Sequence, residues 1–201
     1  AFQRERLGAG AVSIARQGLK LGAGEVPWYL PFGLAECTFD TWPRDALQDM
    51  TFVLNPDGAD NTGWVAVNDK PDASWIRDQL ALGVICMKEW YETGQVSSAC
   101  SPASVGASVG LDNGVTTSAL QAVEAAIEED GIPWDADVWG ALPAQHAGSA
   151  IDKDLYGDMI VGPLPIFDGE SSYCEPGGGK WTGARPLVGF VWAAVYDVKH
   201  A

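Results

Sequence analysis

The sequence contains few residues of the types that bind metals or phosphates. Its 201 residues include two histidines, four cysteines and twelve lysines and arginines, against 27 aspartates and glutamates. His146 and His200 are not spaced as zinc ligands, and there is no Cys-x-x-Cys pair. No glycine-rich phosphate loop follows a strand and opens a helix, so we expect no cofactor. The net charge of −15 repels phosphate backbones and anionic lipid headgroups, which excludes nucleic acid as a partner.

Long apolar runs are also absent. No stretch approaches the roughly twenty residues that a membrane-spanning helix needs. The sequence starts at Ala1 without a basic and apolar leader, so a targeting segment has been removed or was never present. Together with the cysteines, this favours a mature or trimmed extracytoplasmic domain.

The composition is that of a folded chain, with 47% hydrophobic and 10% aromatic residues. A chain of this length buries a sizeable core, so we expect a single domain over residues 1–201, with residues 1–45 loosely packed. The predicted fold class is α+β. It comprises a mixed, largely antiparallel sheet, one well-formed helix at about 118–130, and long loops tied by disulfides.

The four cysteines predict two disulfides in an exported protein. Four buried free thiols in a cytosolic chain are the alternative. Three pairings are possible. We favour Cys86 with Cys100, because they bracket one polar loop, and Cys37 with Cys174 by elimination.

Two apolar runs near the end of the sequence predict neighbouring strands. Residues 187–198 are rich in β-branched and aromatic residues, as in a buried strand, whereas Pro163 and Pro165 place residues 162–168 at a sheet edge. A polar, glycine-rich loop with Cys174 connects the two runs.

Other segments give weaker patterns. Residues 63–67 and the surroundings of Val109 predict short strands, and residues 2–20 predict a loose, glycine-interrupted helix. A helix over about 75–82 has Asp72 or Ser74 as its cap. A short helix is expected over 44–50. The helix at 118–130 begins with a capping-box pattern at Ser118.

Two motifs suggest chemistry, and for both a plainer interpretation is preferred. A turn rich in oxygen donors is a calcium candidate, but its spacing fails the EF-hand pattern and favours an ordinary Asx-rich turn. Its residues are Asn55, Asp57, Asp60 and Asn61. Ser108 lies in a Gly-x-Ser-x-Gly pattern and His146 is a possible base, but the helix that a nucleophile elbow requires after the serine is missing.

Nine tryptophans are many for this length. Exposed tryptophans stack on sugars or contact protein partners. Trp64, Trp75 and Trp192 fall in predicted elements, where core packing is the default. The six that fall in or beside loops are Trp28, Trp42, Trp90, Trp134, Trp139 and Trp181.

The order of several short motifs is more specific than any one of them. A proline-rich aromatic segment leads to Cys37, and Gly63-Trp64 follows it. The later motifs are Asn113-Gly114-Val115 before the Ser118 helix, Trp134-Asp135, residues 161–168 and residues 188–191. This order resembles the extracytoplasmic domain of TadE/TadG-like proteins of the tight-adherence (Flp) pilus assembly system.

The resemblance implies a pseudopilin-like, pilus-associated protein, anchored by an N-terminal membrane helix that would precede Ala1. It implies no active-site residues, so we expect a non-enzymatic, extracytoplasmic structural component. Its partners would be other pilus or cell-surface proteins, or further copies of this chain. Tyr173 and Trp181, in the Cys174 loop, are the candidate contacts. The alternative is a secreted carbohydrate-binding module or hydrolase that uses exposed tryptophans and paired carboxylates.

Overall fold

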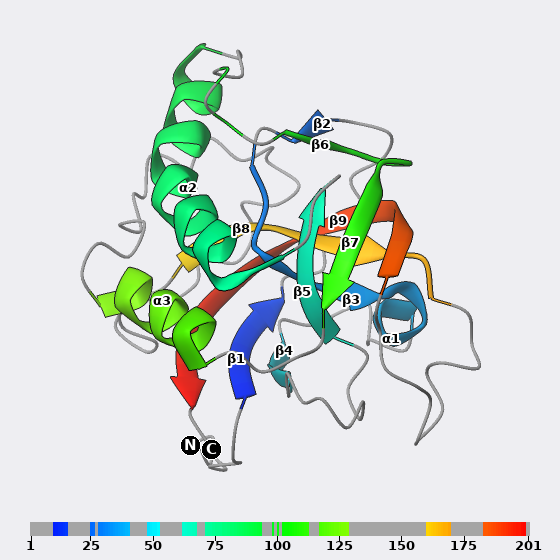
Figure 1. The fold of residues 1–201 in the computed structure, drawn as a ribbon, viewed down its shortest axis with the longest axis horizontal. Helices are drawn as coiled ribbons and strands as arrows, with labels where there is room; N and C mark the ends of the chain where they lie inside the picture. The colour runs from blue at the N-terminus through cyan, green and yellow to red at the C-terminus, as the bar shows by residue number, and fades with distance from the viewer. Residues whose placement is uncertain are drawn as a thin grey trace.

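The computed structural model describes residues 10–15, 25–26, 28–40, 48–52, 62–67, 71–93, 98, 100, 102–112, 117–128, 160–169 and 183–199. They form the mixed α+β arrangement of Figure 1. Its strands are β1 (Gly10–Ala15), β2 (Glu25–Val26), β3 (Phe32–Ala35), β4 (Gln48–Phe52), β5 (Thr62–Val67), β6 (Ala103–Ser104), β7 (Ser108–Asp112), β8 (Ile160–Phe167) and β9 (Gly183–Lys199). Its helices are α1 (Glu36–Asp40), α2 (Ala73–Thr93) and α3 (Thr117–Glu128).

Five strands close into a barrel in the order β9-β7-β5-β3-β8, because β8 also pairs with β9. Strand directions cannot alternate all the way round a ring with an odd number of strands, so one pair must be parallel. That pair is β3 and β8, with Leu34 opposite Ile166. The prediction of a mixed, largely antiparallel sheet is confirmed, but its closure was not predicted.

The expected edge position of residues 162–168 is wrong. Strand β8 has β9 on one side and β3 on the other. The carbonyl of Pro163 accepts a hydrogen bond from the Leu30 N–H at 2.8 Å, so this proline turns its backbone toward the chain leading into β3. The regular ladder with β3 starts only at Ile166, beyond both prolines. The missing proline N–H groups are therefore accommodated inside the wall of a barrel.

Strand β9 is 17 residues long and extends beyond the barrel. Its first part pairs with β7, and its last part pairs with β1, which in turn pairs with β4. The expected loose helix over 2–20 is wrong for β1. Val12 and Ile14 alternate with small residues, and this period of two suits a strand. The expected helix over 44–50 is likewise wrong where described, since Gln48 and Asp49 already lie in β4.

The helices α2 and α3 lie together on one side of the barrel (Figure 1). Helix α2 has 21 residues and is the longest described, so the expectation of a single well-formed helix is wrong. Its start is as predicted: the Asp72 carboxylate accepts hydrogen bonds from the N–H groups of Ser74 and Trp75, both at 2.9 Å. Of the helices in the described ranges, none is long and apolar enough to cross a membrane.

Helix α3 confirms the predicted helix to within two residues. The predicted cap does not hold, because the helix begins at Thr117 and Ser118 lies exposed within its first turn. Ala119, Leu120 and Val123 form its buried stripe, as the spacing of apolar residues predicts.

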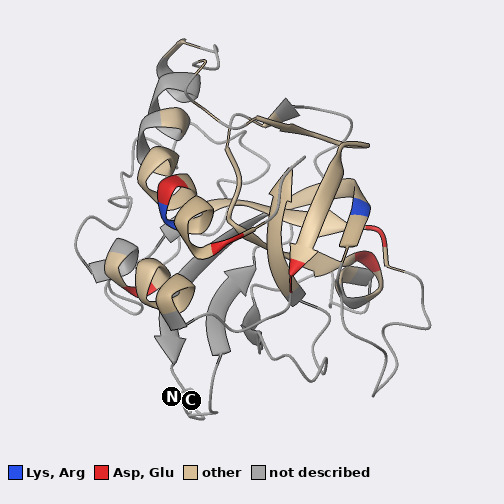
Figure 2. Ribbon diagram, viewed as in Figure 1, with Lys and Arg blue, Asp and Glu red and all other residues tan. Residues whose placement is uncertain are grey.

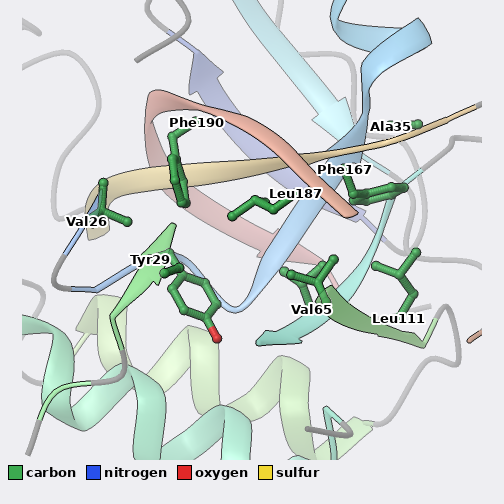
Figure 3. Packing of buried hydrophobic residues seen from close by; sticks show 10 residues of the cluster. Val26, Tyr29, Ala35, Val65, Leu111, Phe167, Leu187 and Phe190 are labelled. Atoms are coloured by element: carbon green, nitrogen blue, oxygen red, sulfur yellow. The ribbon is translucent and has the colours of Figure 1, made fainter. Parts of the chain in front are cut away.

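Apolar side chains form the barrel core (Figure 3). Tyr29 lies among them, and its hydroxyl accepts a hydrogen bond from the Val67 N–H at 2.8 Å. The cluster consists of Val26, Tyr29, Ala35, Val65, Ala103, Val109, Leu111, Phe167, Leu187 and Phe190. Trp64 lies beside Val65 in sequence and is also buried, in edge-to-face contact with Phe32 at 6.3 Å. Strand β5 is thus buried on both faces.

Candidate functional site

Trp28 lies in close packing between helix α2 and the barrel. This side chain is fully buried, and its six-membered ring lies between Gly83 of α2 and Gly162 of β8. A Cβ atom added to Gly83 would lie 2.5 Å from Cζ2 of Trp28, and one added to Gly162 would clash with Cζ3. We call the arrangement of Trp28 between these two glycines the Trp28 slot. Only glycine leaves room for the ring at both positions.

Hydrogen bonds also join α2 to the segment that carries Trp28. The indole N–H of Trp28 donates to the backbone carbonyl of Gln79 at 2.6 Å. The Gln79 side chain is 2% exposed, and its amide nitrogen donates to the backbone carbonyl of Tyr29 at 3.3 Å. The Tyr29 ring also lies 6.1 Å from that of Trp75. Helix α2 is therefore joined to the segment before β3 through both apolar and polar contacts.

The predicted disulfide between Cys86 and Cys100 is confirmed. It links α2 to the segment before β6, with the two Cα atoms 5.7 Å apart and both side chains buried. Cys37 is also disulfide-bonded. Its predicted partner, Cys174, lies outside the described residues. None of the described cysteines is a free thiol.

Most of the other predicted site residues lie outside the part of the chain that the structure describes. The calcium candidates Asn55, Asp57, Asp60 and Asn61 lie outside the described residues. The same holds for the contact candidates Tyr173 and Trp181 and for His146. Among the described residues, no group of three or more His, Cys, Asp or Glu side chains is placed to hold a metal ion.

Ser108 does not lie on a nucleophile elbow. It is the exposed first residue of β7, which runs antiparallel to β5 and β9. The motif begins in a turn, where the Ala107 N–H donates to the Ser104 carbonyl at 3.0 Å. Gly106 occupies the third position of this turn with a φ of 91°, which is typical of a type II turn and favours glycine. The Gly-x-Ser-x-Gly pattern is therefore explained by the turn that connects β6 to β7.

Two of the described tryptophans are too deeply buried to bind a sugar. Trp28 and Trp64 are 0% and 1% exposed, so neither offers a face to a ligand. Trp75 is partly buried against the barrel core. Trp42, Trp134, Trp139 and Trp181 lie outside the described residues, and the side chains of Trp90 and Trp192 lie outside the described set as well.

The charged residues that are described lie on helices or close to the ends of helices and strands (Figure 2). Glu36 and Asp168 occur at the same end of the barrel, since each directly follows one member of the pair Ala35 and Phe167. Asp112 ends β7, and Asp78 and Arg77 are exposed on α2. Two of the described acidic residues thus share one end of the barrel, and the others are spread over different elements.

Comparisons with protein families, curated proteins and solved structures find no match for this chain.

The Trp28 slot was missed at the sequence level, where Trp28 was only a loop tryptophan. Two signals for it are visible in the sequence. Gly83 interrupts an apolar helix and Gly162 lies within a strand, and an isolated glycine in either context often marks a close approach of another group. The sequence does not reveal that one and the same ring approaches both.

Proposed function

We propose that this protein is a structural or assembly component of a tight-adherence (Flp-type) pilus or a related cell-surface appendage, acting through protein–protein contacts outside the cytoplasm. The proposal starts from the sequence resemblance to TadE/TadG-like proteins. One structural observation carries it: four of the segments with that resemblance are neighbours in a single folded unit.

These segments lie in or against the barrel wall. Gly63 and Trp64 belong to β5, residues 161–167 to β8, and residues 188–191 to β9. The aromatic segment before Cys37 supplies Trp28 to the slot and continues into β3. Motifs that form one core are maintained together by packing, so their shared order supports similarity at the level of the fold.

The extracytoplasmic location is supported by the Cys86–Cys100 disulfide. Disulfides form and persist in oxidising compartments and are rare in the cytosol. A chain with a net charge of −15 is suited to contact basic or apolar protein surfaces rather than anionic lipid or nucleic acid.

Gene replacement in the source organism tests the proposal. Deletion of the gene should abolish or strongly reduce the surface pili counted by electron microscopy, and the wild-type gene should restore them. Trp181→Ala should restore them poorly while the purified protein keeps its thermal midpoint. Arg77→Ala, an exposed change on α2, should restore them fully.

Two results would contradict the proposal. One is a normal number of pili in the deletion strain. The other is hydrolysis of polysaccharide by the purified protein at a rate well above background, which would favour the secreted hydrolase. Unfolding of Trp181→Ala would instead remove Trp181 from the candidate contacts.

A further inference from the structure

One short piece of chain contacts the neighbourhood of both cysteines in the Cys86–Cys100 disulfide. It consists of Glu25, Val26 and Trp28, and we call it the β2–Trp28 segment. Val26 of β2 is paired with Ala103 of β6, three residues after Cys100. Trp28 lies against Gly83, three residues before Cys86 on α2. The same segment thus contacts the chain close to each of the two cysteines.

The Trp28 slot determines the position of α2 along its axis. A slip of one residue moves a helix by about 1.5 Å and rotates it by about 100°. Either slip would replace Gly83 in the slot by Leu82 or Val84, whose side chains would meet the ring. It would also replace Gln79 by Asp78 or Leu80, neither of which has the side-chain amide N–H that donates to the Tyr29 carbonyl. Only one register of α2 therefore fits Trp28.

That register presents Cys86 to Cys100. Cys86 lies on the same buried face of α2 as Ile76, Gln79 and Gly83. Disulfides need Cα atoms about 4.4 to 6.8 Å apart, and the observed separation is 5.7 Å. A rotation of about 100° would turn Cys86 away from its partner.

We propose that the β2–Trp28 segment selects the Cys86–Cys100 pairing during oxidative folding, and that Trp28 is a positioning residue for this disulfide. In the oxidation, the two thiols lose two protons and two electrons as the S–S bond forms. A disulfide oxidant such as oxidised glutathione takes up the electrons and is reduced to two thiols. The segment does not take part in this exchange. It brings the two sulfur atoms together before the exchange occurs.

The short sequence separation already favours this pair in an unfolded chain, because a short loop loses little entropy on closure. The test must therefore measure how far the fraction of Cys86–Cys100 exceeds the fraction that closeness in sequence alone would give. The reduced, full-length chain is refolded in a glutathione buffer, and its linkages are mapped by peptide mass spectrometry without reductant. The same chain oxidised in guanidinium chloride gives the fraction of Cys86–Cys100 expected from proximity alone.

The native chain should give Cys86–Cys100 almost exclusively on refolding. Trp28→Ala removes the ring and Gly83→Ala obstructs its place in the slot, and both should shift the fraction toward the value in guanidinium chloride. Trp28→Phe keeps an aromatic ring but loses the indole N–H, and it should give an intermediate fraction. If Trp28→Ala does not fold, the fraction of Cys86–Cys100 in Trp28→Phe serves as the test instead.

Leu120→Ala is the matched control, since it leaves a cavity under α3 and replaces none of the residues that form the slot. It should keep the native pairing. The proposal is overturned if Trp28→Phe and Gly83→Ala pair as the native chain does. It is also overturned if Leu120→Ala loses the native pairing to the same extent, because the effect would then follow global stability.

Discussion

At the scale of single residues, Trp28 has the most demanding environment in the described chain. Its ring needs glycine at two positions that are 79 residues apart in sequence, Gly83 and Gly162. Burial of a tryptophan contributes several kcal/mol, on the order of 3 to 5 by the cost of its truncation. The loss of helix propensity at Gly83, about 1 kcal/mol, is small beside this. The packing of one ring thus accounts for an unfavourable residue inside α2.

We predict that Gly83→Ala destabilises the protein, although the same change in an ordinary helix stabilises it. The gain in helix propensity is about 1 kcal/mol. The added methyl group would lie 2.5 Å from a rigid ring that Gly162 confines on its other side. Such overpacking costs roughly 1 to 3 kcal/mol, and the confined ring places this case near the upper end. Urea denaturation should therefore show a net loss of about 2 kcal/mol.

Ala81→Gly is the control, because Ala81 is exposed on the same helix. It should cost about 1 kcal/mol through propensity alone. A double-mutant cycle with Trp28→Phe tests the cause, since a smaller ring relieves the clash and the two costs should not add. Stabilisation by Gly83→Ala would show that the ring moves away freely.

At the scale of elements, the start of α2 depends on Asp72, one of the two residues that the sequence offers as its cap. The Asp72 carboxylate accepts from two backbone N–H groups and from the Ser74 hydroxyl, the last at 2.6 Å. Replacing Asp72 with Ala leaves these helix N–H groups without their acceptor, and it should cost about 1 kcal/mol in a denaturation experiment. Ser74→Ala removes the hydroxyl but leaves both backbone bonds in place. It should cost clearly less, and equal losses would contradict the capping role.

For helix α3, we predict that truncation of a buried residue lowers the stability and that truncation of an exposed residue raises it slightly. Leu120 is 4% exposed, so Leu120→Ala should cost on the order of 2 to 5 kcal/mol by leaving a cavity. Ser118 is exposed within the helix, so Ser118→Ala should change stability by a few tenths of a kcal/mol in the stabilising direction. Thermal midpoints of the two variants measure both effects. A large loss for Ser118→Ala would restore its interpretation as a cap.

Elements were predictable where local pattern determines them. The cap at Asp72 and the apolar stripe of α3 follow from a few adjacent residues. The first part of α2 was predicted, but its extent to Thr93 was not, because the apolar pattern on which the prediction rested was followed only to residue 82. In β1, the glycines on both sides suggested a broken helix. Its pairing with both β4 and β9 instead satisfies its backbone as a strand.

At the scale of the whole molecule, closure of the barrel could not be predicted from local pattern. It rests on the pairing of β3 with β8, whose residues Ala35 and Phe167 are far apart in sequence. The rule that proline marks an edge strand also pointed away from closure, because β8 has two neighbours. Among the site predictions, the Cys86–Cys100 pair succeeded because its two cysteines bracket one loop. The Trp28 slot was not predicted because its residues come from three segments that are far apart in sequence.

The same long-range contacts predict that α2 and the barrel unfold as one unit. Helix α2 is fixed to the barrel by the Trp28 slot and by the Gln79 bond to Tyr29. Amide protons in α2 and in β8 should therefore exchange through the same global opening. Hydrogen exchange measured by mass spectrometry should give equal opening free energies for the most protected peptides of both elements.

Leu164→Ala makes this last prediction decisive, because Leu164 is a fully buried residue of β8. The cavity should lower the opening free energy by about 2 to 5 kcal/mol. If the unit is cooperative, peptides from α2 lose as much protection as those from β8. Arg77→Ala, exposed on α2, should change neither. Unchanged protection of α2 in Leu164→Ala would mean that the helix opens independently, and that the Trp28 slot does not couple it to the barrel.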